Sequence, residues 1–281
     1  MKVNFSSKTK LYAVIGDPIA HSLSPVFQNN IIELKNMDAV YIPLQITVAS
    51  LGYDIELLRN NFSGFNVTLP HKESIMKYLD EIDPIAKEYG AVNTVKVMGG
   101  KLIGYNTDGY GFRRSIEDIG VDLKNKRILL LGAGGAAKVI AFEIIKLGGK
   151  LTITNRNLDR AHRIKADLEG FYDVPIKVVQ LDKVNKFYDI VINTTPVGMY
   201  PEINNLPINP DRLPNAELVY DIIYNPPETE LLKTASSYDV KTINGLPMLI
   251  YQGLKSFELW TGKAATTREM YEIYGMLERS I

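Results

Sequence analysis

Short apolar runs alternate with stretches of helical periodicity along most of this chain. Runs such as Leu11–Ile15 and Arg127–Leu131 have the length and the aliphatic content of buried strands. The segments between them, for example Ala136–Leu147, repeat apolar residues at the spacing of a helix that buries one face. This alternation predicts an α/β fold, in which helices cover largely parallel sheets.

The pattern divides into two α/β units and a helical tail. We expect the first unit to hold strands at Leu11–Ile15, Val40–Leu44, Gly64–Leu69 and a hairpin of Val92–Val97 with Leu102–Tyr105 around Gly99-Gly100. Its expected helices are Pro25–Met37, Leu51–Asn60 and Glu73–Leu79. The second unit is expected to follow the helix Gly109–Ile119, with strands Arg127–Leu131, Leu151–Thr154, Ile190–Ile192, Leu218–Tyr220 and Lys241–Ile243.

The tail, Pro247–Ile281, is rich in aromatic side chains that need a core to cover them. We therefore expect it to return to the first unit. The cleft between the two units is then the expected place of a binding site.

The most informative local pattern lies after the strand Arg127–Leu131. The segment Gly132-Ala133-Gly134-Gly135-Ala136-Ala137 stands there, directly before a helix. Gly132 permits a tight turn, Gly134 lets the backbone approach a pyrophosphate, and the small Ala137 lets helix and strand pack closely. The helix N-terminus presents free N–H groups and its positive dipole end to the phosphates. We predict a Rossmann-type dinucleotide-binding domain, the alternative being a purely structural turn.

The end of the next strand predicts which dinucleotide binds. Folds that prefer NAD usually place Asp or Glu there for the ribose 2′-hydroxyl. This chain has Asn155-Arg156 instead, with Arg160 one turn further on. A cation at this place suits a 2′-phosphate, so the expected cofactor is NADP. Two solvated arginines without a ligand are the alternative.

Composition excludes several kinds of chemistry. The 281-residue chain is 46% hydrophobic with a formal net charge of +0, so nothing favours nucleic acid or an anionic membrane. It has no cysteine, which removes disulfides and thiolate chemistry and fits a cytoplasmic location. Its 3 histidines lack metal-ligand spacing, so we expect no metal. No run approaches the ~18 apolar residues of a membrane span, and we see no signal peptide.

Polar clusters stand where the strands of the first unit end. They are His21–Ser24, Asn66–Lys72, Gly90–Thr94 and Tyr105–Gly109. Ligands of open α/β sheets bind at the carboxyl ends of strands. Hydroxyls, amides, one lysine and one carboxylate suit a small polyhydroxylated molecule, because each hydroxyl needs a donor and an acceptor. Each cluster alone has a structural explanation, such as Ser24 or Asp108 capping a helix.

In their order, these motifs resemble the shikimate dehydrogenase family from about residue 10 to the C-terminus. The matching segments are Gly16–Pro25, Gly64–Lys72, Gly90–Thr94, Gly104–Gly109, Gly132–Ala137, Asn155-Arg156, Asn193–Met199, Asp221–Pro226 and Gly245–Gln252. The resemblance implies a cytoplasmic enzyme of chorismate and aromatic amino acid biosynthesis. It would reversibly oxidise shikimate to 3-dehydroshikimate with NADP, reduction being the biosynthetic direction. A homodimer is a family expectation.

The resemblance also implies a division of labour. Residues 1–110, with the helices of 247–281, would form the substrate-binding catalytic domain, and residues 111–246 the NADP-binding domain. Lys72 would be the acid/base, oriented by Asp108. The substrate carboxylate would be held by Ser22 and Ser24, with Tyr224 nearby. The ring hydroxyls would be held by Asn66, Thr68, Asn93, Asp108 and Gln252.

The same family pattern implies the cofactor residues. Those at the pyrophosphate would be Gly132, Ala133, Gly134, Gly135 and Ala136. Those at the 2′-phosphate would be Asn155, Arg156, Asn157 and Arg160, although Asn157 stands where NADP-specific members typically have Thr. Ile222, Gly245 and Met248 would lie at the nicotinamide end, and Thr194 is a further expected contact.

Several alternatives stay open at this point. An enzyme that oxidises both quinate and shikimate and uses NAD would share these motifs. A non-catalytic regulatory module would lack Lys72 or Asp108, and a folate-linked dehydrogenase would lack the paired serines Ser22 and Ser24. His71 is expected at the surface or behind the residues that touch substrate. His21 is expected to brace the serine loop, and His162 to be solvated.

Overall fold

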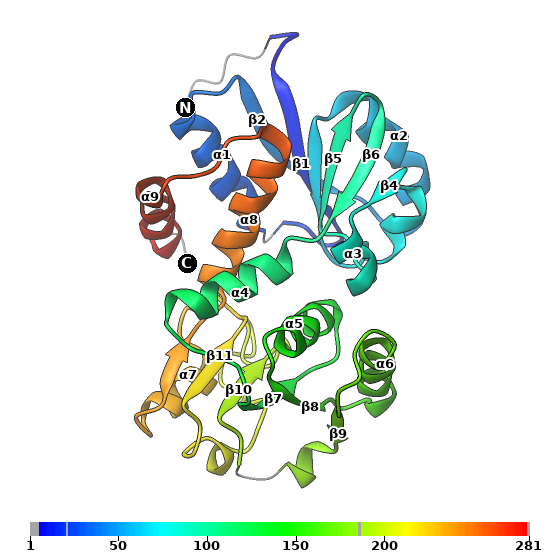
Figure 1. Ribbon diagram of the computed structural model, residues 1–281. Helices are drawn as coiled ribbons and strands as arrows, with labels where there is room; N and C mark the ends of the chain where they lie inside the picture. Colours follow the sequence, from blue (N-terminus) through cyan, green and yellow to red (C-terminus); the bar gives the residue numbers. More distant parts are fainter. Residues whose placement is uncertain (1–5, 21, 185–186, 280–281) are drawn as a thin grey trace. The chain divides into compact units, whose positions relative to one another are not determined.

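The computed structural model describes residues 6–20, 22–184 and 187–279. The chain forms two compact units, each with a six-stranded sheet (Figure 1). Unit 1 contains the described residues of Met1–Tyr110 and Ile250–Ser280, and unit 2 those of Gly111–Leu249. The predicted two-domain α/β class is confirmed, with the C-terminal helices returning to unit 1.

Unit 1 contains a mixed sheet with the strand order β2-β1-β3-β5-β6-β4. β1 pairs in parallel with β2 and β3, β5 is antiparallel to β3 and β6, and β6 is parallel to β4. Among the described strands, β5 therefore runs against the rest. The strands are β1 Lys10–Gly16, β2 Ala39–Gln45, β3 Gly64–Val67, β4 Glu81–Ile82, β5 Thr94–Met98 and β6 Lys101–Tyr105. The helices are α1 Ser24–Leu34, α2 Leu51–Asn61, η1 Ser74–Tyr78, α3 Pro84–Tyr89 and α9 Thr267–Glu278, with part of α8.

The hairpin of β5 and β6 turns where the sequence predicts it. Gly99 and Gly100 have φ angles of +59° and +77°, as a two-residue type I′ turn requires. The expected helix over Glu73–Leu79 is instead the 3₁₀ helix η1. The short elements β4 and α3 were not expected, because six residues or fewer show no clear periodicity.

Trp260 fastens the C-terminal tail to the sheet of unit 1. Its ring stacks on Tyr12 with centroids 5.1 Å apart, and its Nε1 donates to the Val95 carbonyl at 2.9 Å. Gly64 in β3 leaves the space that this ring needs, since a Cβ there would lie 2.4 Å from Trp260 Cδ1. Trp260 of the tail thus contacts β1, β3 and β5.

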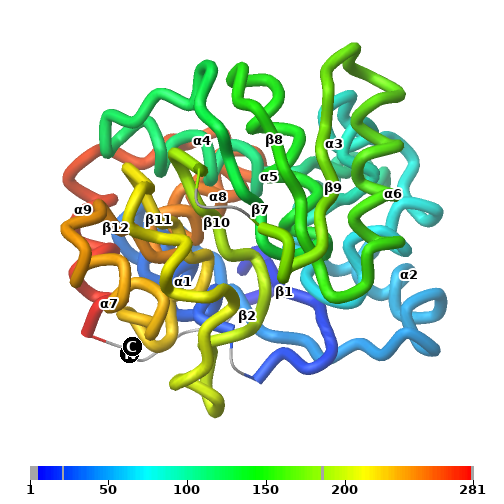
Figure 2. Tube along the Cα trace, turned by 90° about the horizontal axis from the view of Figure 1, so that it is seen from below, coloured from blue at the N-terminus to red at the C-terminus, as the bar shows by residue number. Residues whose placement is uncertain are grey.

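Unit 2 is a parallel sheet with the order β12-β11-β10-β7-β8-β9, which Figure 2 shows running across the view. This is the doubly wound dinucleotide-binding topology, whose order reverses between β7 and β10. The strands are β7 Arg127–Leu131, β8 Lys150–Thr154, β9 Lys177–Val179, β10 Ile190–Asn193, β11 Leu218–Asp221 and β12 Lys241–Ile243. The helices are α4 Asp108–Asp118, α5 Gly135–Lys146, α6 Leu158–Glu169, α7 Glu230–Ser236 and α8 Leu246–Thr261, with 3₁₀ turns η2 Leu181–Lys183 and η3 Pro210–Arg212.

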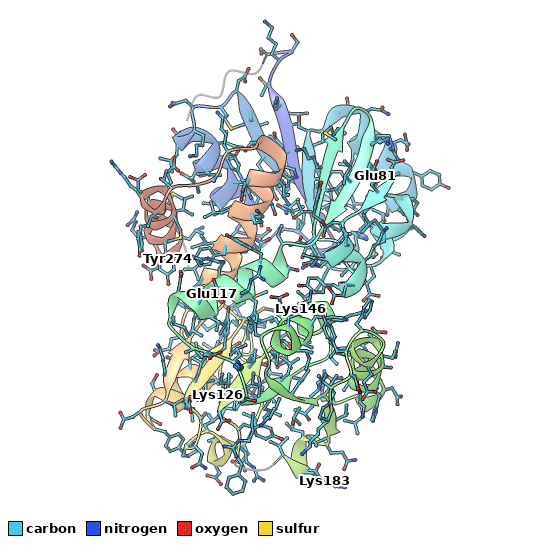
Figure 3. All side chains as sticks on the ribbon, viewed as in Figure 1. Glu81, Glu117, Lys126, Lys146, Lys183 and Tyr274 are labelled. Carbon is cyan, nitrogen blue, oxygen red and sulfur yellow. The ribbon has the colours of Figure 1, made fainter. Side chains whose placement is uncertain are left out.

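α4 and α8 each begin in one unit and end in the other. Exposed side chains of both charges, such as Glu81 and Lys183, cover the surfaces of the units (Figure 3). No helix in the described part of the chain is both long and apolar enough to cross a membrane.

The fit of Trp260 against Gly64 gives a testable expectation. Gly64→Ala would place a methyl group inside the space of the indole, so we expect the free energy of unfolding to fall by about 1–3 kcal/mol. Trp260 is the chain's one tryptophan, so urea unfolding followed by its fluorescence reports on unit 1.

Gly275→Ala is the matched control. Gly275 lies inside α9, where the nearest atom to an added Cβ is Arg279 Nη1 at 3.7 Å. Alanine there should raise stability by about 0.5–1 kcal/mol, because glycine is a poor helix former. Equal effects of the two substitutions would contradict this account of the tail.

Candidate active site

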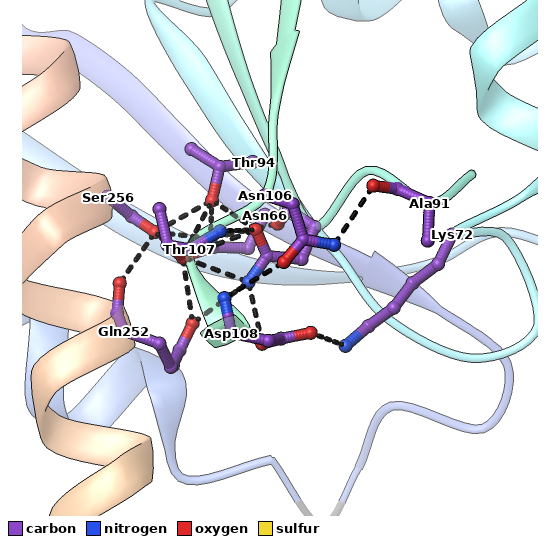
Figure 4. A network of polar contacts seen from close by, with 10 residues as sticks. Asn66, Lys72, Ala91, Thr94, Asn106, Thr107, Asp108, Gln252 and Ser256 are labelled. Atoms are coloured by element: carbon purple, nitrogen blue, oxygen red, sulfur yellow. Dashed lines mark hydrogen bonds and ion pairs between the residues drawn. The ribbon is translucent and has the colours of Figure 1, made fainter. Parts of the chain in front are cut away.

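The catalytic candidates of unit 1 lie at one edge of its sheet. Lys72 follows β3 and Asp108 follows β6, so both lie beyond the carboxyl ends of strands with the same direction. Asn93 precedes β5, and because β5 is reversed, its start lies at the same edge. Residues from three separate parts of the sequence therefore meet (Figure 4).

Lys72 and Asp108 form an ion pair at this edge. Lys72 Nζ donates to Asp108 Oδ2 at 2.6 Å, and the side chains are 19% and 9% exposed. Asp108 Oδ1 accepts from Asn93 Nδ2 at 2.7 Å. Asp108 also lies in the first turn of α4, where the helix dipole favours a carboxylate. The carboxylate is held on both oxygens while the amine keeps access to solvent.

Asn93 connects this pair to the rest of the network. Its Nδ2 also donates to Thr107 Oγ1 at 2.9 Å and to Gln252 Oε1 at 3.3 Å. Its Oδ1 accepts from the Thr107 backbone N–H at 2.8 Å. Gln252 reaches the network from α8. The structure thus brings together four of the predicted residues, Lys72, Asn93, Asp108 and Gln252.

Both polar atoms of the Asn66 amide are bonded within the protein. It is 7% exposed, and its Oδ1 accepts from the Tyr41 hydroxyl at 2.7 Å. Its Nδ2 lies 3.1 Å from each of three acceptors, the Asn93 carbonyl, Thr94 Oγ1 and Ser256 Oγ. The amide supports Asn93 through these bonds, and its expected contact with a substrate hydroxyl stays a prediction.

Two polar residues of this network, Tyr41 and Ser256, were missed in the prediction, whereas Thr94 and Thr107 lay in the predicted polar clusters without an assigned role. Thr107 adjoins Asp108 in sequence, and Ser256 lies four residues after Gln252 on the same face of α8, so both had a local signal. Ser256 Oγ lies 2.7 Å from Thr94 Oγ1 and 3.1 Å from Thr107 Oγ1. Tyr41 had no such signal, because only strand pairing brings β2 beside this group.

The serine loop follows β1. Ser22 Oγ accepts from the Ser24 N–H at 3.3 Å, and both residues are half-buried. Ser24 is the first residue of α1. Burial raises the pKa of Tyr41 well above its ordinary value. Thr68 follows β3, with its N–H bonded to the Ile15 carbonyl. His21 lies outside the described residues.

His71 is fully buried, which rules out the first of its two expected positions, at the surface, and leaves the second, behind the residues that touch substrate. Its Nε2 lies 2.6 Å from the Ile46 carbonyl, which ties the segment before Lys72 to the loop after β2. His162 is exposed, as expected. No cluster of three potential metal-ligating side chains occurs in the part of the chain that is described.

In unit 2, the glycines after β7 differ in what surrounds them. Gly132 has a φ of +110°, and a Cβ there would lie 2.5 Å from Thr194 Oγ1. The fold itself therefore requires this glycine. No described atom would lie within 4 Å of a Cβ on Gly134 or Gly135. Nothing in the packing requires those two, but they leave the N-terminus of α5 open to a phosphate.

Two of the four predicted 2′-phosphate residues, Asn155 and Arg156, line a cavity beyond the ends of β8 and β9. The cavity has a volume of about 240 Å³ and is lined by Asn155, Arg156, Leu158, Gln180, Leu181 and Asp182. The Arg156 and Arg160 side chains are exposed, and neither forms an ion pair with another described residue. Asn157 caps α6, its Oδ1 accepting from the Asp159 N–H at 2.9 Å.

The other predicted cofactor residues stand at the carboxyl ends of β10 to β12, together with Tyr224, which was predicted to lie near the substrate carboxylate. Thr194 Oγ1 donates to the Leu131 carbonyl at 2.7 Å. Ile222 and Tyr224 follow β11, where burial raises the pKa of Tyr224. Gly245 follows β12, and Met248 lies in the first turn of α8 with 8% of its surface exposed.

Three family models match successive parts of the chain. The shikimate dehydrogenase substrate-binding domain matches residues 14–95, shikimate/quinate 5-dehydrogenase matches residues 114–223, and the shikimate 5′-dehydrogenase C-terminal domain matches residues 245–273. A shikimate dehydrogenase (NADP(+)) of Methanococcus maripaludis is 46% identical over 92% of this chain and 93% of its own length. The chain belongs to the shikimate dehydrogenase family.

Solved structures of the family agree in fold. A shikimate dehydrogenase in complex with NADP+ is 41% identical, with a TM-score of 0.91, over 98% of this chain and 97% of its own. Shikimate 5-dehydrogenase from Listeria monocytogenes, in complex with shikimate and NAD, is 32% identical with a TM-score of 0.89 over 97% and 99% of the two chains. The predicted family is confirmed along nearly the whole chain.

The bonding of Asn66 can be tested by removing its amide. Asn66→Ala would remove one hydrogen-bond partner from each of the buried hydroxyls of Tyr41, Thr94 and Ser256. We therefore expect the free energy of unfolding to fall by about 1–3 kcal/mol or more. Urea unfolding followed by Trp260 fluorescence would measure the change.

Asn60→Ala is the control, because Asn60 is exposed on α2 and its amide bonds only the Glu56 carbonyl one turn back. That change should stay within about 0.5 kcal/mol. A stable Asn66→Ala protein would contradict the supporting role and would favour direct contact with a ligand.

Proposed function

We propose that this protein catalyses the reversible NADP-linked oxidation of shikimate to 3-dehydroshikimate, with reduction as the biosynthetic direction. The observation that carries the proposal is the 2.6 Å pair of Lys72 and Asp108, held by Asn93 among hydroxyl and amide groups at one sheet edge. This is an acid/base pair beside groups suited to a polyhydroxylated ring.

Lys72 is the proposed proton carrier. Reduction of a ketone needs a proton on oxygen, which the Lys72 ammonium donates; in the reverse direction the amine accepts it. Asp108 holds Lys72 Nζ in place and can accept a hydrogen bond from the reacting hydroxyl. When bound, the nicotinamide supplies the hydride. Thr107 and Gln252, both bonded to Asn93, complete the set of groups at this edge.

The serines of the loop after β1 are proposed to bind the substrate carboxylate. Ser22 and Ser24 lie at the start of α1, where free N–H groups and the helix dipole favour an anion. Asn29 of α1 bonds the Tyr41 backbone, and the Tyr41 hydroxyl donates to Asn66, which connects α1 to the network around Asn93. Carboxylate binding and hydroxyl binding would then share one set of buried hydrogen bonds.

Unit 2 fits NADP. The open backbone at Gly134 and Gly135 and the N-terminus of α5 would receive the pyrophosphate, and Arg156 and Arg160 the 2′-phosphate. Asn157 lacks the hydroxyl of the family's usual Thr, but its Oδ1 caps α6 and its Nδ2 can still donate to a phosphate. NADP named for the Methanococcus relative supports this choice.

The competing proposal is that this protein also uses NAD or quinate. It is supported by the Listeria structure, which is a complex with shikimate and NAD. Initial rates, read from nicotinamide absorbance, should be measured for shikimate and quinate, each with NADP⁺ and NAD⁺. We expect turnover largely confined to shikimate with NADP⁺. Comparable rates with quinate or NAD⁺ would assign the broader specificity.

Arg156→Ala tests the cofactor part in the same assay. Losing a charged hydrogen bond worth about 1.5–3 kcal/mol should reduce the preference for NADP⁺ over NAD⁺ by about 10- to 100-fold, mainly through KM. Arg212→Ala removes a cation from η3 of the same unit and should leave the preference unchanged. An unaltered preference in Arg156→Ala would contradict the assignment of the 2′-phosphate.

Asp108→Asn tests the catalytic part. Asparagine keeps the size of the side chain but loses the charge that holds Lys72, so we expect kcat to fall by about 10²-fold or more with thermal unfolding little changed. Asp83→Asn is the control, because Asp83 caps α3 and asparagine caps equally well. A near-normal kcat in Asp108→Asn would overturn the role of this pair.

A further inference from the structure

A buried carboxylate that the catalytic scheme leaves unused lies at the end of β11. Asp221 is 0% exposed. Its Oδ1 accepts from Asn193 Nδ2 at 3.0 Å and from the Ile223 N–H at 3.1 Å, and its Oδ2 accepts from Thr229 Oγ1 at 2.7 Å. No described residue forms an ion pair with it. The carboxylate is therefore held by neutral donors alone.

These three donors belong to three different segments of unit 2. Asn193 ends β10, and its Oδ1 accepts from the N–H and the hydroxyl of Thr195 at 3.0 and 2.7 Å. Thr229 is the N-cap of α7 and accepts from the Leu232 N–H. Asp221 thus joins the ends of β10 and β11 to the start of α7.

The backbone after β11 has little freedom once these bonds are made. The Ile222 N–H donates to the Asn193 carbonyl at 3.0 Å, and the Gly245 N–H to the Ile223 carbonyl at 3.0 Å. A Cβ on Gly245 would lie 1.9 Å from the Ile222 carbonyl oxygen, so the segments after β11 and β12 touch directly. The position of Ile222 follows from that of Asp221.

The topology shows which half of a dinucleotide these segments face. In a doubly wound sheet the two halves of the cofactor lie on opposite sides of the point where strand order reverses. That point lies between β7 and β10, and Arg156 places the adenosine half beyond β8. The carboxyl ends of β10, β11 and β12 are left for the nicotinamide half.

We propose that Asp221 is a positioning residue that holds Ile222 and Gly245 where the nicotinamide ring lies against them. The inference rests on the proposed function for the identity of the cofactor. Asp221 touches neither cofactor nor substrate and acts through Asn193, Ile223 and Thr229.

Ionisation of this buried carboxylate is costly, whereas the hydrogen bonds themselves do not require a charge. Burial raises the pKa of Asp221 to about 6, although the bonds from Thr229, Ile223 and Asn193 lower it. A carboxyl group whose pKa is raised on folding disfavours the folded state when it ionises. A neutral side chain of the same size would avoid that penalty.

The experiment compares binding of whole and half cofactor. Asp221→Ala removes all three bonds, whereas Asp221→Asn keeps the Oδ1 acceptor and can donate to Thr229 Oγ1. NADPH, followed by its fluorescence, reports on both halves, and 2′,5′-ADP, followed by calorimetry, reports on the adenosine half alone. For Asp221→Ala we expect kcat to fall at least tenfold and NADPH to bind at least fivefold more weakly, with 2′,5′-ADP affinity within twofold of the wild type.

Asp221→Asn should restore all three quantities to within about threefold. Asp189→Ala is the control: Asp189 lies just before β10 at the opposite end of the sheet, where it pairs with Arg127 at 2.6 Å. It should leave kcat and the ratio of the two affinities unchanged. Wild-type values in Asp221→Ala, or an equal defect in Asp221→Asn, would overturn the inference.

If Asp221→Ala loses the fold of unit 2, loss of 2′,5′-ADP binding reveals it. Thr229→Val then decides, because it removes one donor and keeps the shape of the side chain. We expect it to weaken NADPH binding relative to 2′,5′-ADP by at least threefold, and an unchanged ratio would overturn the inference. If the wild type bound NADPH but oxidised no substrate, the proposed function would fail while these affinity ratios still tested Asp221.

Discussion

Buried polar groups must have hydrogen-bond partners, and this constraint governs the candidate active site. Asn93 is where the partners converge, because its amide bonds Asp108, Thr107 and Gln252 at once. None of the buried side-chain atoms of this network lacks a partner among the described residues. The geometry of the Lys72–Asp108 pair therefore depends on side chains from five elements of unit 1, including β2 and α8.

Unit 2 has the same fold class as unit 1, but the strand ends on the two sides of its sheet differ in how closely they are bonded. At Gly134 and Gly135 the chain leaves space and unpaired N–H groups at the start of α5, as an anion site needs. On the other side of the reversal in strand order, backbone bonds and the buried Asp221 fix the segments after β10 and β11 closely. One half of the sheet edge is open and the other half is tightly bonded.

Much of the fold and of the candidate site could be predicted from short local patterns. The β7–α5–β8 segment, the Gly99-Gly100 turn and the paired positions Lys72 and Asp108 are all encoded in short stretches. The elements and contacts that were not predicted depend on pairing between residues far apart in the sequence. β4 is two residues long and exists because β6 lies beside it, and Tyr41 reaches Asn66 only because β2 and β1 are in parallel register.

The internal bonding of Asn66 has the same origin. Its position in a motif at a strand end indicates a functional residue, but the motif cannot show that Tyr41 and Ser256 already occupy its amide. The burial of His71 was likewise invisible, since a histidine beside a lysine looks polar in sequence. The motifs identified which segments meet. Which side chains are bonded within the protein could be seen only in the three-dimensional structure.

The reversed strand β5 has a further consequence. Asn93 stands just before β5, so the first residues of this strand lie at the site. The other end of β5 leads into Gly99 and Gly100, which form the tip of the hairpin farthest from the site. No described atom lies within 4 Å of a Cβ built on either glycine. That tip is a natural attachment point on unit 1, where a peptide tag or a surface tether can be inserted while the chain on both sides keeps its pairing.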